Sequence, residues 1–161
     1  MAIQQQHAGQ GRVVGKSRYV TPLLENIAAQ AQSADSTRSI SADIVAALKN
    51  NDVIKMGTSE ELSGLGSSLV EIANDLSAIA PCCTSTAWVI WNHLCLSHHF
   101  CGLLGPAHSR FLESIVNNGE LISQGVGPGT SVTGTREGDR VLINGVTTFA
   151  TGCRYGDWTG V

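Results

Sequence analysis

The sequence predicts an α+β fold, in which an N-terminal all-helical domain of about five helices precedes the start of an antiparallel β-domain. Apolar residues recur at helical spacing from residue 18 to about residue 118. From residue 119 onward they alternate with polar residues, as in strands, between glycine-rich turns. We therefore expect a flexible, Gln/Gly-rich arm at 1–17, a helical domain at 18–118 and the start of a β-domain at 119–161.

The composition indicates one folded domain with little charged surface. Of the 161 residues, 42% are hydrophobic and 14% are charged, whereas an ordinary soluble domain is roughly 25% charged. So few charges suggest that part of the surface meets another domain or chain. We therefore expect a homo- or hetero-oligomer.

Charge and hydropathy exclude several classes of partner. The net charge is −3, without a basic stripe that could follow nucleic acid. The apolar runs are too short to span a membrane, and the first residues lack the apolar core of a signal peptide. The five cysteines have no regular spacing, so we expect reduced thiols in a cytoplasmic protein.

Helix signals follow one another along the first part of the chain. Thr21 and Pro22 are expected to open a helix over about 21–31, and Ser41 to cap a second one ending near residue 50. The stretch 57–66 is expected to form a loop. A third helix is expected to start after Ser67 or Ser68 and to stop at Pro81.

The next two helices are predicted from caps and apolar spacing. Thr84, Ser85 and Thr86 are expected to cap a helix through Leu104 that is apolar almost all round, and therefore central and buried. Gly105 and Pro106 then begin a fifth helix, which Asn117-Asn118-Gly119 closes.

The remaining residues predict an antiparallel meander. Strands are expected at 121–126, 131–133, 140–143 and 146–149, with turns at Gly127-Pro128-Gly129, Glu137-Gly138-Asp139 and Asn144-Gly145. Residues 157–161 look like the beginning of a further strand, so we expect only the start of a β-domain here.

Three segments together resemble a known family. They are Gly64-Leu65-Gly66 with the helix that follows at 68–73, Thr84-Ser85-Thr86-Ala87-Trp88, and the stretch 144–158 with Phe149-Ala150-Thr151-Gly152-Cys153. From residue 18 to 161 the chain resembles the acyl-CoA dehydrogenase superfamily. The last two segments are similar to its flavin-dependent monooxygenase branch, the oxygenase components of two-component aromatic hydroxylases.

The resemblance implies a larger fold. Family members have a helical domain, a middle β-domain and a C-terminal helical bundle, with flavin between the last two. By this comparison the C-terminal bundle is absent, and we expect no turnover until a missing part or a partner chain completes the site. The implied cofactor is reduced flavin, FMN or FAD, and the implied partners are O2, a small aromatic substrate and a separate flavin reductase.

The resemblance also implies roles for single residues. Phe149 is expected beside the flavin ring, the Thr151 hydroxyl at its reactive edge as a catalytic group, and Gly127 in a loop that approaches the cofactor closely. From spacing alone, an ordinary hairpin is the favoured interpretation of 146–152, and a plain tight turn explains Gly127 equally well.

The long helix at 84–104 carries the candidates for substrate binding. By the same resemblance, this helix contributes to an aromatic-substrate pocket lined by Trp88, His93 and His98. One of His93, His98 and His99 is expected to bond or deprotonate a phenol, and His93 is the candidate catalytic group. The alternative is a buried histidine bonded to a backbone carbonyl. We expect no metal site, because Cys101 faces away from Cys95 and the neighbouring histidines.

The leading hypothesis is therefore a flavin-dependent monooxygenase acting on an aromatic or related small substrate. One alternative is an acyl-CoA dehydrogenase that oxidises an acyl thioester. It is less favoured because Phe149 replaces the usual tryptophan and Gly127-Pro128-Gly129 the usual acidic loop. The other alternative is a non-catalytic split or truncated chain that pairs with a homologous subunit.

Overall fold

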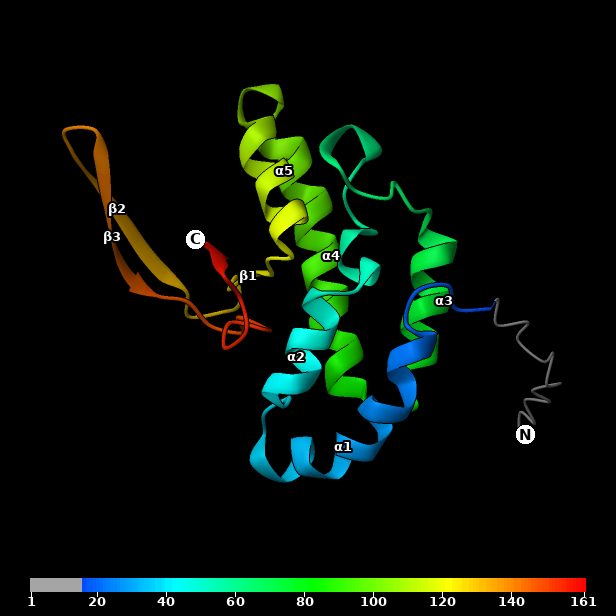
Figure 1. The fold of residues 1–161 in the computed structure, drawn as a ribbon. Helices are drawn as coiled ribbons and strands as arrows, with labels where there is room; N and C mark the ends of the chain where they lie inside the picture. Colours follow the sequence, from blue (N-terminus) through cyan, green and yellow to red (C-terminus); the bar gives the residue numbers. More distant parts are fainter. Residues whose placement is uncertain (1–15) are drawn as a thin grey trace, which may run out of the picture.

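A computed structural model describes residues 16–161, and over this range it confirms the α+β class (Figure 1). The helices are α1 (Leu24–Thr37), α2 (Ala42–Lys49), α3 (Leu69–Ile79), α4 (Thr84–Leu104) and α5 (Ser109–Asn118). The strands are β1 (Ile122–Gln124), β2 (Ser131–Glu137), β3 (Arg140–Val146) and β4 (Trp158–Gly160). No helix within residues 16–161 is long and apolar enough to cross a membrane.

The start of the described chain is tied to α3. The carboxylate of Asp75 on α3 accepts the backbone N–H groups of Arg18, Tyr19 and Val20 at 3.0, 2.8 and 2.9 Å. Asp75 is buried, so these hydrogen bonds compensate for the removal of its charge from water. The expected arm at 1–17 lies outside the described residues, except for Lys16 and Ser17.

The helix starts agree only in part with the expected caps. Thr21 does not cap α1, because its hydroxyl pairs with the Ser17 hydroxyl at 2.7 Å and a short 3-10 turn precedes the helix. Ser41 does cap α2, accepting the N–H of Ile44 at 3.3 Å. Ser68 and Glu71 form a reciprocal capping box at the start of α3.

The long helix α4 differs from its prediction at both ends. Its cap is Cys83, and Thr84 lies in the first turn, where its hydroxyl donates to the carbonyl of Ala80 at 3.2 Å. The expected hydroxyl caps were therefore wrong. Burial is confirmed for one face only, from Thr86 to Ser97, because Trp88 on the same stretch is 57% exposed and Leu103 near the other end is 64% exposed.

The hydrophobic core lies among α1 to α4 and the 3-10 turn at Asp52–Lys55 (Figure 1). Its most buried apolar side chains include Val20, Ile27, Leu48, Val53, Ile79, Ile90 and Leu94. Helix α5 packs beside the second half of α4, and Gly119 closes it in a left-handed conformation at φ 65°, as expected.

The strands do not form the expected meander. Strands β2 and β3 make an antiparallel hairpin, but β1 pairs in parallel with β4, with Ile122 opposite Trp158. The predicted turn at Asn144-Gly145 was wrong, because both residues remain in β3, where Gly145 crosses close to the Ser131 carbonyl. The chain then leaves the hairpin and returns beside β1 (Figure 1).

Candidate functional site

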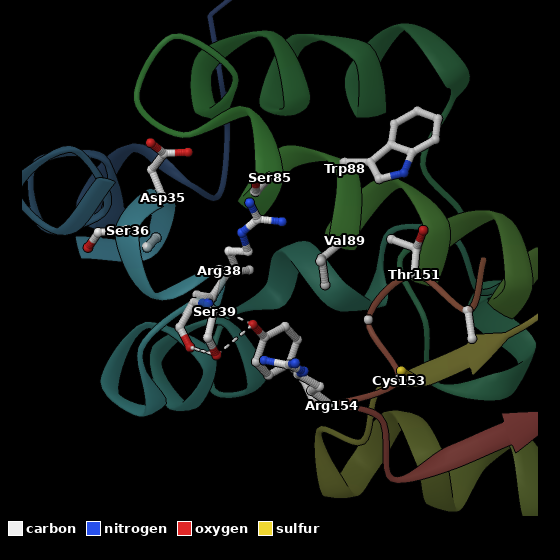
Figure 2. Close-up of a pocket in the computed structure, with 15 residues that line it drawn as sticks. Asp35, Ser36, Arg38, Ser39, Ser85, Trp88, Val89, Thr151, Cys153 and Arg154 are labelled. Atoms are coloured by element: carbon white, nitrogen blue, oxygen red, sulfur yellow. Dashed lines mark hydrogen bonds between the residues drawn. The ribbon is translucent and has the colours of Figure 1, made fainter. Parts of the chain in front are cut away.

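A groove of about 700 Å³ lies between the end of α1, the first turns of α4 and the turn at 150–155 (Figure 2). Three separate parts of the sequence supply its walls. From the α1 end come Asp35, Ser36, Arg38 and Ser39; from α4, Ser85, Trp88 and Val89; from the turn, Thr151, Cys153, Arg154 and Tyr155. The volume is within the range of about 300–1,000 Å³ that is typical of small-molecule sites.

Tyr155 fixes one wall of the groove to another. Its hydroxyl oxygen lies 2.6 Å from the backbone N of Ile40 and accepts that N–H, and it lies 3.1 Å from the Ser39 hydroxyl. A Cβ on Gly152 would also touch Val89 of α4 at 3.4 Å. The turn is therefore held against both the α1–α2 connection and α4.

Two predicted residues, Trp88 and Thr151, are brought together by this arrangement. Both line the groove, although they are far apart in the sequence (Figure 2). Trp88 is 57% exposed, so a flat apolar surface is open to a ligand. Thr151 adds an uncharged hydroxyl on the facing turn.

The groove also contains charged residues that the sequence reasoning missed. Arg38, which ends α1 in a left-handed conformation at φ 52°, and Arg154 bring guanidinium groups, while Asp35 brings a carboxylate. Arg38 and Ser85, at the start of α4, both line the groove (Figure 2). The position of Arg154 directly after the Phe149–Cys153 motif was the one sequence signal that could have placed it at the site. Arg38 reaches the groove through tertiary packing alone, which no sequence signal reveals.

Phe149 and Gly127, the other predicted cofactor residues, contact each other outside the lining of this groove. A Cβ on Gly127 would lie 2.0 Å from Cδ2 of Phe149, so the glycine leaves room for that ring. The Gly127 N–H donates to the Thr148 carbonyl at 3.2 Å, which holds the two segments together. Phe149 itself is 78% exposed and has a positive φ of 56°.

His93 lies in the core, where both ring nitrogens are engaged by the backbone. Its Nε2 lies 3.0 Å from the Ile54 carbonyl oxygen, and its Nδ1 accepts the Ile122 N–H at 3.0 Å. These partners require the neutral tautomer with the proton on Nε2. Burial lowers the pKa of His93 to about 4, which the Ile54 carbonyl offsets only partly. The side chain does not line the groove with Trp88.

His98 lines a different cavity, of about 420 Å³, between α3, α4 and the loop at 56–67. The three predicted substrate residues Trp88, His93 and His98 are therefore separated into a groove, a core position and a second pocket. Among residues 16–161, no group of three or more His, Cys, Asp or Glu side chains is placed to hold a metal ion.

The groove offers an aromatic wall, uncharged hydroxyls and guanidinium groups in one place. This combination suits a ligand with a planar ring system and an anionic group. Neither a model of a known protein family nor a curated protein matches the chain. The case for a function rests on the groove and on the motifs that line it.

Proposed function

We propose that this chain forms the helical domain and the start of the β-domain of a flavin-dependent monooxygenase related to the acyl-CoA dehydrogenase superfamily. The enzyme would use reduced FMN or FAD and O2 to hydroxylate an aromatic or related small substrate. The observation that carries the proposal is that Trp88 and Thr151, each from a motif resembling that branch, line the same groove.

The residues of the groove fit a flavin in their chemistry. The exposed face of Trp88 offers apolar contact to a planar ring, and the Thr151 hydroxyl offers a hydrogen bond without adding charge. The guanidinium groups of Arg38 and Arg154 suit the phosphate of the cofactor. When bound, reduced flavin supplies the electrons that activate O2.

Phe149 would extend the apolar surface beyond Thr151. It is separated from Thr151 only by Ala150, which itself lines the groove, and its ring rests beside Gly127. His93 has no role in proton transfer in this proposal, because the backbone engages both of its nitrogens. The groups that act on the substrate would belong to the groove.

The exposed β2–β3 hairpin supports a second candidate, a non-catalytic chain that pairs with a homologous subunit. Val141, Leu142, Ile143 and Val146 of β3 are each about half exposed or more, and both edges of the hairpin are unpaired within residues 16–161. Such a surface favours association with another polypeptide. This second role requires an oligomer.

The test of the enzyme proposal is flavin binding, with a matched pair of threonine variants. Under anaerobic conditions, the chain is titrated with dithionite-reduced FMN and FAD, and binding is followed by tryptophan fluorescence. We expect saturable binding that Thr151→Val weakens about threefold to tenfold, the value of one hydrogen bond. Thr135→Val, on the exposed strand β2, should leave the affinity unchanged.

Two results would contradict the proposal. One is the absence of saturable binding of both reduced FMN and reduced FAD. The other is an equal loss of affinity in Thr151→Val and Thr135→Val, because the hydroxyl in the groove would then have no specific role.

A further inference from the structure

We propose that the pocket containing His98 is a second binding site, for a small neutral molecule that is mostly apolar and carries one hydroxyl group. The pocket has a volume of about 420 Å³ and lies between the start of α3, the middle of α4 and the loop at 56–67. Its residues on α4, from Trp91 to His98, follow those that line the groove. The site is thus separate from the proposed flavin groove.

The lining predicts an uncharged ligand. No Asp, Glu, Lys or Arg is among the described residues that form the pocket, whereas the groove contains two arginines and an aspartate. Burial raises the pKa of the Cys95 thiol, which therefore stays neutral at pH 7. Apolar side chains make up most of the wall, among them Met56, Leu69, Ile72, Trp91 and Leu94. Burial of a ligand's apolar surface against them would drive binding.

Thr58 supplies a polar group inside this apolar wall. Its side chain is 3% exposed, and its hydroxyl has no hydrogen-bond partner within residues 16–161. Every completely buried side-chain oxygen or nitrogen in that range does have a partner. Thr58 lines the pocket, which is where a ligand hydroxyl would meet its side chain.

The pocket is held in shape by the backbone. A Cβ on Gly57 would lie 2.4 Å from the carbonyl oxygen of Leu94, so the loop rests directly on α4. The Leu65 N–H donates to the Lys55 carbonyl at 3.0 Å, and the Gly66 N–H to the Thr58 carbonyl at 2.8 Å. These bonds close the loop on itself, so little ordering is needed when a ligand binds.

His98 provides a second polar contact, at the exposed edge of the pocket. Its neighbour His99 is also exposed on α4 but does not line the pocket. The pair therefore offers a matched control, since His98→Ala and His99→Ala remove the same group from the same exposed helix. Thr58→Val and Thr58→Ser form a second pair, which removes or keeps the buried hydroxyl.

The experiment titrates the ¹⁵N-labelled chain with benzyl alcohol, and with toluene as the analogue that lacks the hydroxyl. The indole N–H signal of Trp91 reports on the pocket, and that of Trp88 on the groove. We expect benzyl alcohol to shift the Trp91 signal saturably while the Trp88 signal stays in place. Thr58→Val should weaken benzyl alcohol binding about threefold to tenfold and leave toluene binding unchanged.

The control variants complete the test. Thr58→Ser and His99→Ala should bind benzyl alcohol like the unchanged chain, while His98→Ala should bind it more weakly. The proposal is overturned if benzyl alcohol leaves the Trp91 signal unchanged, shifts Trp88 equally, or binds Thr58→Val and the unchanged chain alike. It is also overturned if His98→Ala and His99→Ala have the same affinity. The test needs no flavin, so its outcome is independent of the enzyme proposal.

Discussion

The Nδ1 atom of His93 accepts the backbone N–H of Ile122 at 3.0 Å. This bond joins the middle of α4 to β1, and the opposite ring nitrogen joins the same helix to the 3-10 turn through the Ile54 carbonyl. Because Nδ1 must accept this N–H, protonation of His93 would break the link. The neutral side chain of His93 thus links α4 both to β1 and to the 3-10 turn.

His93 predicts a loss of stability at mildly acidic pH. Its pKa is about 4 in the folded chain and 6.5 in the unfolded chain, so the unfolded state takes up a proton first. The free energy of unfolding should be highest above pH 6.5 and should fall by up to about 3 kcal/mol towards pH 4. Urea unfolding followed by circular dichroism between pH 7.5 and 4 measures this slope.

The matched variant for this prediction is His93→Gln, which cannot titrate. It should be less stable than the unchanged chain at pH 7.5 but should lose less stability on acidification. Glu71 and Asp157 have a lowered pKa, so their contributions begin to be lost only near their unfolded values of 4.5 and 3.8, at the acid end of this range. A variant that keeps the full slope between pH 6.5 and 4 would show that His93 is not its cause.

We predict that replacing the Asp75 carboxylate with an amide lowers the free energy of unfolding strongly. Asp75→Asn keeps one oxygen, which can still accept the Tyr19 and Val20 N–H groups, but its NH2 group cannot accept the N–H of Arg18 and the buried negative charge is lost. We expect a loss of roughly 2–4 kcal/mol in urea unfolding. Asp43→Asn, at an exposed position in the first turn of α2, should cost less than about 1 kcal/mol. Equal losses would refute this role for Asp75.

The capping box predicts a smaller effect at the start of α3. Ser68→Ala removes the hydroxyl that accepts the Glu71 N–H at 3.3 Å, and should lower the free energy of unfolding by about 1 kcal/mol. Ser59→Ala is the control, because Ser59 precedes a 3-10 turn without a side-chain cap. Thermal unfolding of the two variants should differ in midpoint; identical midpoints would argue against the cap.

We predict that the Tyr155 hydroxyl stabilises the wall of the groove at Ile40. Tyr155→Phe leaves the Ile40 N–H without its partner, and should cost about 1–3 kcal/mol and speed hydrogen exchange of the Ile40 amide. Tyr19→Phe is the control, because the Tyr19 hydroxyl has no hydrogen-bond partner among the described residues. Unchanged exchange at Ile40 in Tyr155→Phe would mean that the turn is held by other contacts.

The helices could be predicted because their signals are local. Ser41 and Ser68 precede apolar residues at helical spacing, and Gly119 follows the last turn of α5. The caps at Thr21 and Thr84–Thr86 were wrong because hydroxyls also bond to nearby side chains and carbonyls, which spacing does not reveal. The local sequence pattern thus predicts that a helix is present more reliably than it predicts the residue at which the helix begins.

The strand pairing and the site depended on contacts between distant residues. Asn144-Gly145 reads as a turn, yet β3 continues through it because pairing with Thr133 and Val132 decides the outcome. His93 and His98 are neighbours on one helix, but one faces the core and the other a pocket. The resemblance assigned Trp88 to the substrate and Thr151 to the flavin, but it did not predict that they line one groove together with Arg38 and Arg154.

The most direct test of the enzyme proposal is to locate the binding site of reduced flavin on the chain. The ¹⁵N-labelled protein is titrated anaerobically with reduced FMN, and the indole N–H signals of its three tryptophans are compared. If the groove is the flavin site, the Trp88 signal moves saturably, while those of Trp91 and Trp158 remain in place. Saturable binding that moves Trp91 or Trp158 instead, or no binding at all, would contradict it.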